Sequence, residues 1–517
     1  MHLKLSSIML AILVLLPECE AQYEDWKHSG SLYIITTPEG ADLPAGAIEH
    51  NFPLLVRLEQ AFFDFDQALA TGADLRFSVG GSPLAYQIEQ WDPQEGTAQI
   101  WVRIPVIKGH DQQLIKMHWG KANVASEGNS ESVCRVADGF AGVWHLNDTL
   151  EDATSNNLDG FNKPDTPTKN SRGMIGDGQE FGANKLLVIR PPGVAGDRRV
   201  TCMPSGNADR TMSAWVKPTS FEGLNWASAS IGGWGEPNRG VKPNMGLSYM
   251  TMTGIGQPRF HLYGFDPRCE SPLSRAEWRH VALSVSDNMV RFYIDGVLQN
   301  TINNSGALVN QLGTLNTPES TPVDLGDHGN GRGPFNGILD EVRFESTARS
   351  EDWMTLCFEN QKPLQTLVGP LVQENNNFSV SHTNINLGEA RTIDLSIEAG
   401  GARKIYWMLI DGDTETILAV DRFEYQFNSG RVDGSKEVTL QVRALFASGL
   451  KSKNIRINIQ ESLPNPVYTL SVPKTWNGRD ELVISPSIKT LAGIISPDSG
   501  ELNYSWTVSG MATISET

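Results

Sequence analysis

Along most of this 517-residue chain, apolar and polar residues alternate in short runs that end at glycine, asparagine or aspartate. Residues 290–297 (VRFYIDGV) show the pattern, because apolar side chains at alternate positions share one face and Asp295-Gly296 can supply the positive φ of a two-residue hairpin turn. A period of two predicts strands, and no long stretch keeps the 3.6-residue period of a helix. We therefore expect an all-β protein built of several antiparallel sandwiches.

The most regular set of such runs lies between residues 142 and 344. Its blocks, in chain order, are VWHLN at 143–147, SAWVKP at 213–218, WRHVALSV at 278–285, FYIDGV at 292–297 and GILDEVRF at 337–344. In this order they resemble the LamG-like branch of the concanavalin A-type jelly rolls. That resemblance implies a jelly roll over residues 135–370 that binds carbohydrate or protein, often with a structural calcium ion. It does not imply one reaction, because function resides in sites grafted on a fold.

Residues 22–134 predict a second β-sandwich ahead of the jelly roll. The blocks that carry this prediction are DLRF at 74–77, QIEQWD at 87–92, IWVRIP at 100–105 and KMHWGKAN at 116–123. They resemble the bacterial family known as domain of unknown function 2341, which commonly precedes a LamG-like module in exported proteins. This resemblance brings no catalytic residues with it.

The N-terminal end of the chain has the pattern of a targeting segment. Residues 1–21 combine Lys4 in a positive n-region, an apolar run from Ile8 to Leu16 and a cleavage position at Ala21, which predicts a signal peptide, with a lipoprotein through Cys19 as the alternative. No apolar run is long enough for a membrane span. We therefore expect a mature chain without a transmembrane segment, secreted or at the cell surface, with the periplasm as an alternative.

The C-terminal part predicts immunoglobulin-like sandwiches. Residues 378–461 contain strand-like runs and place Trp407 where such domains bury a tryptophan. Without flanking cysteines, this stretch resembles the PKD-like variety. Residues 466–517 begin a second copy, with Trp506 in the corresponding place, but about 50 residues cannot close a sandwich of about 100. We therefore expect further domains downstream of Thr517.

The charge balance narrows the choice of partners. The chain has 60 acidic and 42 basic residues, a formal net charge of -18. Such a balance suits divalent-cation sites and argues against a nucleic-acid partner.

Four cysteines remain after the predicted signal peptide, an even number that suits an oxidising compartment. Three connectivities are open from the sequence alone. If the first and last strands of the jelly roll lie side by side, as the resemblance implies, a Cys134–Cys357 disulfide would join the ends of the module. Cys202 and Cys269 would then form the second pair.

Oxygen-bearing side chains recur at alternate positions just after the first block of the jelly roll. Asp152, Thr154 and Asn156 could wrap a hard cation such as Ca²⁺. In similar jelly rolls an aspartate on the last strand often reaches the same ion, and here that residue would be Asp340. The alternative is a polar turn whose side chains cap their own backbone.

Ligand contacts are expected in residues 223–264, which are rich in glycine, asparagine and tryptophan. In a sandwich such segments form the loops where ligands bind. The expected contacts are Trp226, Trp234, Asn238 and Arg239, and the alternative is an ordered cover over the sheet.

Catalysis by the jelly roll is not expected. Retaining glycosidases bring two carboxyl groups within ~5–5.5 Å. The nearest match is Glu341 to Glu345, where Arg343 stands between the two glutamates and would hold both ionised. Along a regular strand at ~3.3 Å per residue these glutamates lie about 13 Å apart. We therefore predict that this chain is not an enzyme, leaving any domain downstream open.

The expected function is recognition of a glycan or cell-surface polysaccharide by a secreted or surface protein, with a role in adhesion. Two alternatives remain: a structural surface protein, and the non-catalytic targeting part of a larger polysaccharide-degrading enzyme.

Overall fold

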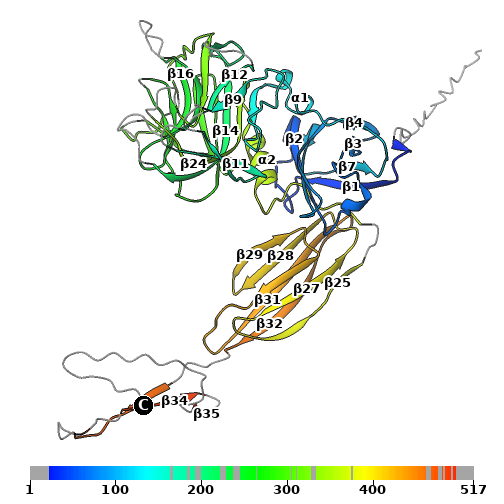
Figure 1. Cartoon of the computed structure of the whole chain (residues 1–517), viewed down its shortest axis with the longest axis vertical. Coiled ribbons are helices and arrows are strands. Elements are labelled where there is room, and N and C mark those ends of the chain that lie inside the picture. The colour runs from blue at the N-terminus through cyan, green and yellow to red at the C-terminus, as the bar shows by residue number, and fades with distance from the viewer. Residues whose placement is uncertain are drawn as a thin grey trace, which may run out of the picture. The chain divides into compact units, whose positions relative to one another are not determined.

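The computed structural model shows an all-β, multidomain protein, as predicted (Figure 1). The structure describes residues 23–162, 167–182, 185, 187–192, 199–221, 229–236, 245–263, 265–303, 305–309, 311–327, 333–373, 377–461, 467–475, 480, 484–490 and 493–495. The predicted signal peptide therefore lies outside the described residues. In the part that is described, no helix is long and apolar enough to cross a membrane.

The chain divides into two compact units. The first comprises residues 1–376, 400–405 and 444–451, and the second comprises residues 377–399, 406–443 and 452–517. The first unit holds both the N-terminal β module and the jelly roll.

The N-terminal module consists of two antiparallel sheets. One has the order β1 (His28–Ile35), β7 (Gln112–Trp119), β3 (Arg76–Val79) and β4 (Ser82–Leu84), and the other has the order β2 (Ile48–Glu59), β6 (Thr97–Lys108) and β5 (Tyr86–Asp92). The short helices η2 (Phe65–Gln67), α1 (Ser130–Val133) and η3 (Val136–Asp138) accompany them. Apolar residues of both sheets, such as Val102 and Met117, meet in the core.

The jelly roll consists of two larger sheets (Figure 1). The eight-stranded sheet has the order β10 (Lys169–Arg172), β11 (Asp177–Phe181), β24 (Asn336–Glu345), β14 (Arg210–Ser220), β19 (Arg279–Ser286), β20 (Met289–Ile294) and β21 (Val297–Gln299), and β8 (Phe140–Trp144) also pairs with β24. The nine-stranded sheet has the order β22 (Thr301–Ile302), β18 (Arg268–Cys269), β17 (Pro258–His261), β16 (Leu247–Met252), β15 (Ser230–Gly235), β23 (Thr321–Leu325), β12 (Leu187–Arg190) and β9 (Asp159–Asn162), and β13 (Arg199–Val200) pairs with β23.

The hairpin predicted at Asp295-Gly296 is confirmed. Ile294 pairs with Val297, and the two turn residues have φ values of 52° and 78°. These are the left-handed conformations of a type I′ turn.

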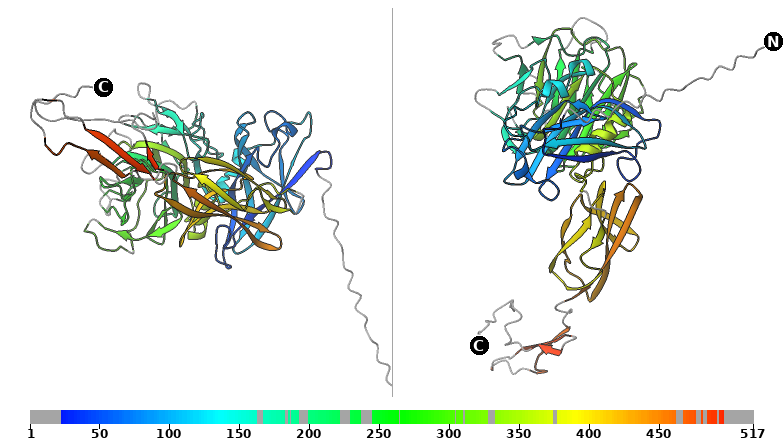
Figure 2. Two further views of the ribbon diagram at one scale, coloured as in Figure 1. Left: turned by 90° about the horizontal axis from the view of Figure 1, so that it is seen from below. Right: turned by 90° about the vertical axis from the view of Figure 1, so that its right-hand side faces the viewer.

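The outer face of the eight-stranded sheet is covered by other parts of the first unit. One hydrophobic cluster combines Val102 of the N-terminal module, Ala282 and Tyr293 of that sheet, and Trp353 of helix α2 (Glu351–Gln361). Figure 2 shows the N-terminal strands, in blue, beside the green strands of the jelly roll. The two modules therefore share this hydrophobic cluster, while a second cluster lies between the two sheets of the jelly roll.

Helix α2 begins and ends with specific polar contacts. The Ser350 hydroxyl accepts a hydrogen bond from the Trp353 N–H at 2.9 Å and so caps the N-terminus of the helix. At the other end, the Asn360 amide accepts from the Leu55 N–H at 2.6 Å and donates to the Leu55 carbonyl at 2.9 Å. The helix is thus attached to β2 of the N-terminal module.

The chain leaves the first unit beside the strand by which it enters. The Ile35 N–H donates to the Leu367 carbonyl at 2.7 Å, and the Val372 N–H donates to the Ser31 carbonyl at 2.9 Å. These bonds form a short antiparallel zipper between β1 and residues 367–372.

The second unit carries an antiparallel sheet of three strands and a mixed sheet of five. The first has the order β25 (Phe378–Val380), β27 (Thr392–Ala399) and β30 (Glu424–Asn428), and the second has the order β26 (Asn384–Gly388), β32 (Gly449–Gln460), β31 (Ser435–Phe446), β28 (Lys404–Asp411) and β29 (Thr414–Val420). Trp407 is fully buried and donates to the Arg422 carbonyl at 2.9 Å, as expected of the sandwich tryptophan. A three-stranded sheet of β33 (Val467–Ser471), β34 (Ser485–Thr490) and β35 (Gly493–Ile495) follows, and Trp506 lies outside the described residues.

Candidate functional site

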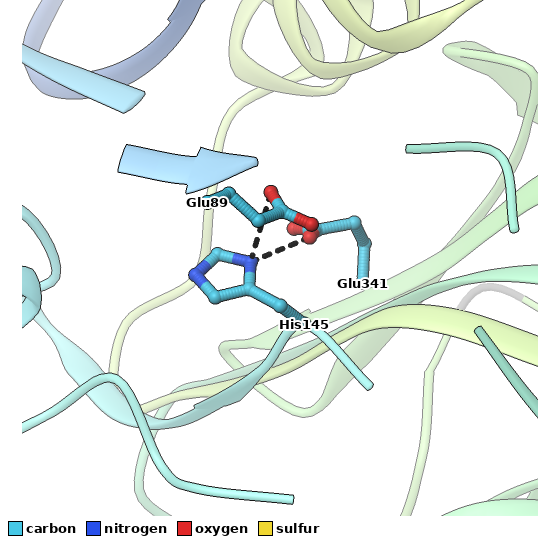
Figure 3. A group of neighbouring side chains, drawn as sticks. All are labelled: Glu89, His145 and Glu341. Atoms are coloured by element: carbon cyan, nitrogen blue, oxygen red, sulfur yellow. Dashed lines mark hydrogen bonds and ion pairs between the residues drawn. The ribbon is translucent and has the colours of Figure 1, made fainter. Parts of the chain in front are cut away.

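A buried group of ionisable side chains lies where the N-terminal module meets the jelly roll (Figure 3). Glu89 comes from β5, His145 directly follows β8, and Glu341 comes from β24. Only 1% of the side-chain surface of Glu89 and of Glu341 is exposed. We call these three residues the Glu-His-Glu cluster.

The backbone of β24 places Glu341 in this cluster. Pairing with β14 shifts register between Ser213 and Trp215, so that Glu341 and Val342 together face one residue of β14. Glu341 has a φ of 50°, in the left-handed region that side chains other than glycine seldom adopt. Leu146, next to His145, also has a positive φ, of 58°. Backbone strain of this kind concentrates at functional sites.

The imidazole of His145 lies against both carboxylates. Its Nδ1 is 2.5 Å from Oε1 of Glu341 and 3.7 Å from Oε2 of Glu89. Its Nε2 is 3.4 Å from Oε1 of Gln87, and its ring stacks on Trp101 with the centroids 5.7 Å apart. The nitrogen and one oxygen of each glutamate all lie within 4.8 Å of one another.

Two further side chains hold the carboxylates. Arg343 Nη2 donates to Glu341 Oε2 at 2.7 Å, and its guanidinium lies 4.7 Å from the centre of the Trp101 ring. Trp101 Nε1 donates to Glu89 Oε2 at 2.5 Å. A third carboxylate, Asp340, accepts hydrogen bonds from the backbone N–H groups of Met174 and Ile175.

Burial and neighbouring charges shift the titration of these groups in different directions. Burial raises the pKa of Glu89 to about 7 and holds the pKa of Asp340 well above its usual range. Burial also acts to raise the pKa of Glu341, but His145 and Arg343 lower it on balance. Burial acts to lower the pKa of His145, but the Glu341 and Glu89 carboxylates raise it on balance. Both shifts favour an ion pair between the His145 imidazole and the Glu341 carboxylate.

The cluster has the ligand types of a metal centre but not the exposure of a glycosidase site. A histidine nitrogen and two carboxylate oxygens are ordinary ligands of Zn²⁺ and similar ions. A polysaccharide cannot reach Glu341, which is paired with Arg343, or Glu345, which is buried and paired with Arg349. The expectation that Arg343 keeps Glu341 ionised agrees with this geometry.

Sequence reasoning did not assign Glu89 and His145 to a site. His145 lies within the strand block VWHLN at 143–147 and is buried. Its partners Glu89 and Glu341 are 56 and 196 residues away in the chain, and no local pattern joins positions so far apart. The one available signal was the presence of charged residues within an otherwise apolar strand block, as in GILDEVRF at 337–344.

The expected calcium ligands lie in two places. Asp152 accepts from the N–H groups of Val143, Thr154 and Leu158 and from the Thr154 hydroxyl, which in turn accepts from the Asn156 N–H. The Asp152 oxygens are thus occupied by hydrogen-bond donors rather than free for a cation, and Asp340 is bonded to another segment. This donor set does not fit Ca²⁺, and it matches the self-capped turn that was the alternative.

The expected ligand contacts fall mostly outside the described residues. Trp226, Asn238 and Arg239 are among the residues that the structure does not describe. Trp234 is fully buried in the jelly-roll core, where its Nε1 donates to the Pro204 carbonyl at 2.9 Å. The prediction that Trp234 contacts a ligand is therefore wrong, because its indole fills the space between the two sheets.

The expected disulfides are also corrected, since Cys134, Cys202, Cys269 and Cys357 are all free thiols. Cys134 and Cys357 belong to one hydrophobic cluster, where burial raises the pKa of both thiols to about 12. Cys269 lies on β18, whereas Cys202 follows β13, which pairs with β23. Four strand steps of about 4.8 Å separate β18 from β23, a span of about 19 Å that a disulfide cannot bridge.

A pocket opens at one end of the nine-stranded sheet. It has a volume of about 270 Å³ and is lined by Phe265, Asp266, Asn303 and Ser305. Asp266 is held by two donors, the His261 ring at 2.8 Å and the Leu262 N–H at 2.9 Å. Burial acts to raise its pKa, but His261 and Arg259 lower it on balance, so Asp266 is ionised at neutral pH.

Tyr263 stands three residues before Asp266 and is 44% exposed. Its φ of 69° is an outlier for a bulky side chain. An exposed aromatic ring on a strained backbone thus lies next in the chain to the pocket residues.

Two family models match the first unit. Residues 197–354 match the concanavalin A-like lectin/glucanases superfamily, and residues 71–149 match the domain of unknown function DUF2341. Among curated proteins, the adhesion G-protein coupled receptor V1 of Danio rerio is 26% identical over 174 residues, which cover 32% of this chain and 3% of that protein.

Two solved structures are similar to parts of this chain at a low level. Domain 4 of AbnA, an extracellular arabinanase of Geobacillus stearothermophilus in complex with arabinotriose, has a TM-score of 0.31 and 17% identity, covering 42% of this chain and 97% of that one. The binding domain of Paraclostridial Mosquitocidal Protein 1 has a TM-score of 0.29 and 12% identity, covering 68% of this chain and 87% of that one. Similarity at this level does not extend to function. From the family matches and the fold, this chain carries a jelly-roll module of the concanavalin A-like lectin/glucanases superfamily, preceded by a module of the DUF2341 family.

Proposed function

We propose that this chain is a secreted or cell-surface recognition protein that binds carbohydrate through its jelly roll without catalysis. The observation that carries the proposal is the pocket of Phe265, Asp266, Asn303 and Ser305, on a module of the lectin/glucanases superfamily. The export part rests on the signal-peptide pattern of residues 1–21.

The chemistry of the pocket suits sugar hydroxyl groups. An ionised carboxylate accepts strong, charge-assisted hydrogen bonds, and Asn303 and Ser305 add polar groups of neutral charge. His261 and the Leu262 N–H fix the orientation of Asp266 before any ligand arrives, which reduces the entropic cost of binding. The volume of about 270 Å³ is near the lower end of the range for small-ligand sites, so one or two sugar rings would fill it.

Aromatic side chains supply the apolar part of such a site. Phe265 lines the pocket, and Tyr263 offers an exposed ring beside it in the chain. The apolar face of a sugar ring packs on an aromatic ring, and this contact distinguishes sugars from other polar ligands.

The test is binding of the full chain to an array of neutral and acidic polysaccharides and oligosaccharides. We expect hits with the unmodified chain, and a loss of affinity of about 10-fold or more in Asp266→Asn and in Tyr263→Ala, which corresponds to about 1.4 kcal/mol for each contact. The matched controls are Asp177→Asn and Val297→Ala, at exposed positions of the other sheet.

Two results would contradict the proposal. An array without any hit would remove carbohydrate as the ligand, and unchanged affinity in both Asp266→Asn and Tyr263→Ala would place binding elsewhere. Thermal unfolding of Asp266→Asn must be measured in parallel, because this residue also pairs with His261. Tyr263→Ala does not carry that complication, since its ring is exposed.

A further inference from the structure

We propose that Glu89, His145 and Glu341 bind a divalent transition-metal ion, with Zn²⁺ as the expected occupant, and that this ion joins the N-terminal module to the jelly roll. The proposed function concerns the pocket on the nine-stranded sheet, and the metal site is independent of it.

The ligand set is the first support. One imidazole nitrogen and one oxygen from each of two glutamates lie within 4.8 Å of one another, so modest side-chain rotation can place all three on one ion at ~2.0–2.2 Å. The outer nitrogen of His145 faces Gln87 Oε1 at 3.4 Å. A partner of this kind orients a metal-binding histidine and leaves its other nitrogen free for the ion.

The charge balance is the second support. Glu89, Glu341 and Asp340 bring three carboxylates into a region closed to water, where Arg343 supplies one fixed positive charge. A buried charge without compensation is costly, so the site must take up either protons or a cation. One dication together with Arg343 would balance the three carboxylates.

Orphaned polar atoms and backbone strain are the third support. Within the described residues, Oε1 of Glu89 and Oδ1 of Asp340 are buried without a hydrogen-bond partner. Glu341 itself, and Leu146 beside His145, have left-handed backbone conformations. The fold thus maintains unfavourable features on both sides of the cluster, which is typical of a site shaped for a ligand.

Metal binding must displace a proton. His145 Nδ1 and Glu341 Oε1 lie 2.5 Å apart, which is the separation of a hydrogen bond rather than that of two ligands on one ion. Binding forms a bond from the ion to Nδ1 and bonds to the two glutamate oxygens, and the proton leaves to the solvent. The affinity should therefore rise with pH.

The experiment measures zinc in the full chain. Protein stripped with a chelator and dialysed at pH 7.5 is titrated with ZnCl₂ by calorimetry in two buffers of different ionisation enthalpy, and its metal content is measured by mass spectrometry. We expect uptake of a single equivalent, release of a proton and a rise in Tm. Ca²⁺ at the same concentration should have no effect, because a histidine nitrogen is a poor ligand for calcium.

Variants locate the site. Glu89→Gln and His145→Asn should lower zinc affinity by about 10- to 100-fold or more. The matched control is Glu345→Gln, which changes a buried glutamate of the same strand that pairs with Arg349 and lies outside the cluster.

Three outcomes would overturn the proposal. A folded wild-type chain that takes up no zinc would show that the cluster holds a proton only. Full zinc binding by both cluster variants, or equal loss in Glu345→Gln, would place the ion elsewhere. Since the wild-type titration needs no variant, misfolding of a variant cannot rescue the proposal.

Discussion

At the scale of single residues, His280 is a buried histidine that the fold keeps neutral. It is 2% exposed, its ring lies 5.4 Å from that of Trp215, and its Nδ1 has no hydrogen-bond partner among the described residues. Burial, followed by the charge of Arg343, lowers the pKa of His280 to about 3.

The depressed pKa of His280 predicts loss of stability in mild acid. The unfolded chain takes up a proton at His280 below pH ~6.5, whereas the folded chain does so only near pH 3. The free energy of unfolding therefore loses nothing through His280 above pH 6.5. Below that pH it loses about 1.4 kcal/mol for each pH unit. Urea unfolding of His280→Phe between pH 7 and 4.5 should show a shallower decline than the wild type.

The control for this experiment is His382→Phe, at an exposed position. Its free energy of unfolding should fall with pH as steeply as that of the wild type. Equal slopes in wild type and His280→Phe would mean that other groups dominate the acid response.

At the scale of elements, local chemistry was predictable and long-range pairing was not. The Asp295-Gly296 hairpin and the Ser350 N-cap depend on residues that are neighbours in the chain, and the structure has both. The bulge at Glu341 arises only when β24 pairs with β14, about 130 residues earlier in the chain. Trp234 was misassigned for the same reason, since only the opposing sheet decides whether an aromatic side chain is covered.

The hairpin also supports a prediction about packing. A Cβ on Gly296 would lie 3.1 Å from Cβ of Phe358 and 3.2 Å from the Met354 carbonyl oxygen, both on α2. The residue also has a positive φ, which alanine adopts at a cost. Gly296→Ala should therefore destabilise the chain by about 1–2 kcal/mol, measured by urea unfolding.

Gly412 provides the comparison, because it has a positive φ of 61° but open space where its Cβ would be. Gly412→Ala therefore measures the loss of stability that comes from the positive φ alone. If the two variants lose equal stability, the contact with α2 contributes nothing.

At the scale of the whole molecule, the N-terminal module and the jelly roll pack directly against each other at their boundary. Sequence resemblance predicted a boundary between residues 22–134 and 135–370, and family models match residues 71–149 and 197–354. It could not foresee that they share a hydrophobic cluster and the Glu-His-Glu cluster. Glu89, His145 and Glu341 each look like an ordinary residue of a strand block within their own module. Only the packing of the two modules shows that these side chains contact one another.

The shared hydrophobic cluster predicts that the N-terminal module and the jelly roll unfold together. Asn360→Ala leaves the N–H and carbonyl of Leu55 buried without partners, at a cost of about 1–3 kcal/mol. Hydrogen exchange measured by mass spectrometry should then accelerate in β6 and in β14 alike. Faster exchange in β6 alone would indicate two independent folding units.

Asn458→Ala is the control, since Asn458 bonds to Asn386 on the surface of the second unit. Exchange in β6 and β14 should not respond to it.

The zipper between β1 and residues 367–372 has a mechanical consequence. Because the two segments run antiparallel, tension between the chain before β1 and the chain after Val372 acts at the same end of the zipper and opens its hydrogen bonds one after another. Such peeling requires far less force than shearing all the bonds at once. Under tension the hydrogen bonds of the zipper would therefore open before those of the jelly roll. The jelly roll would bear load only after the chain had lengthened at the zipper.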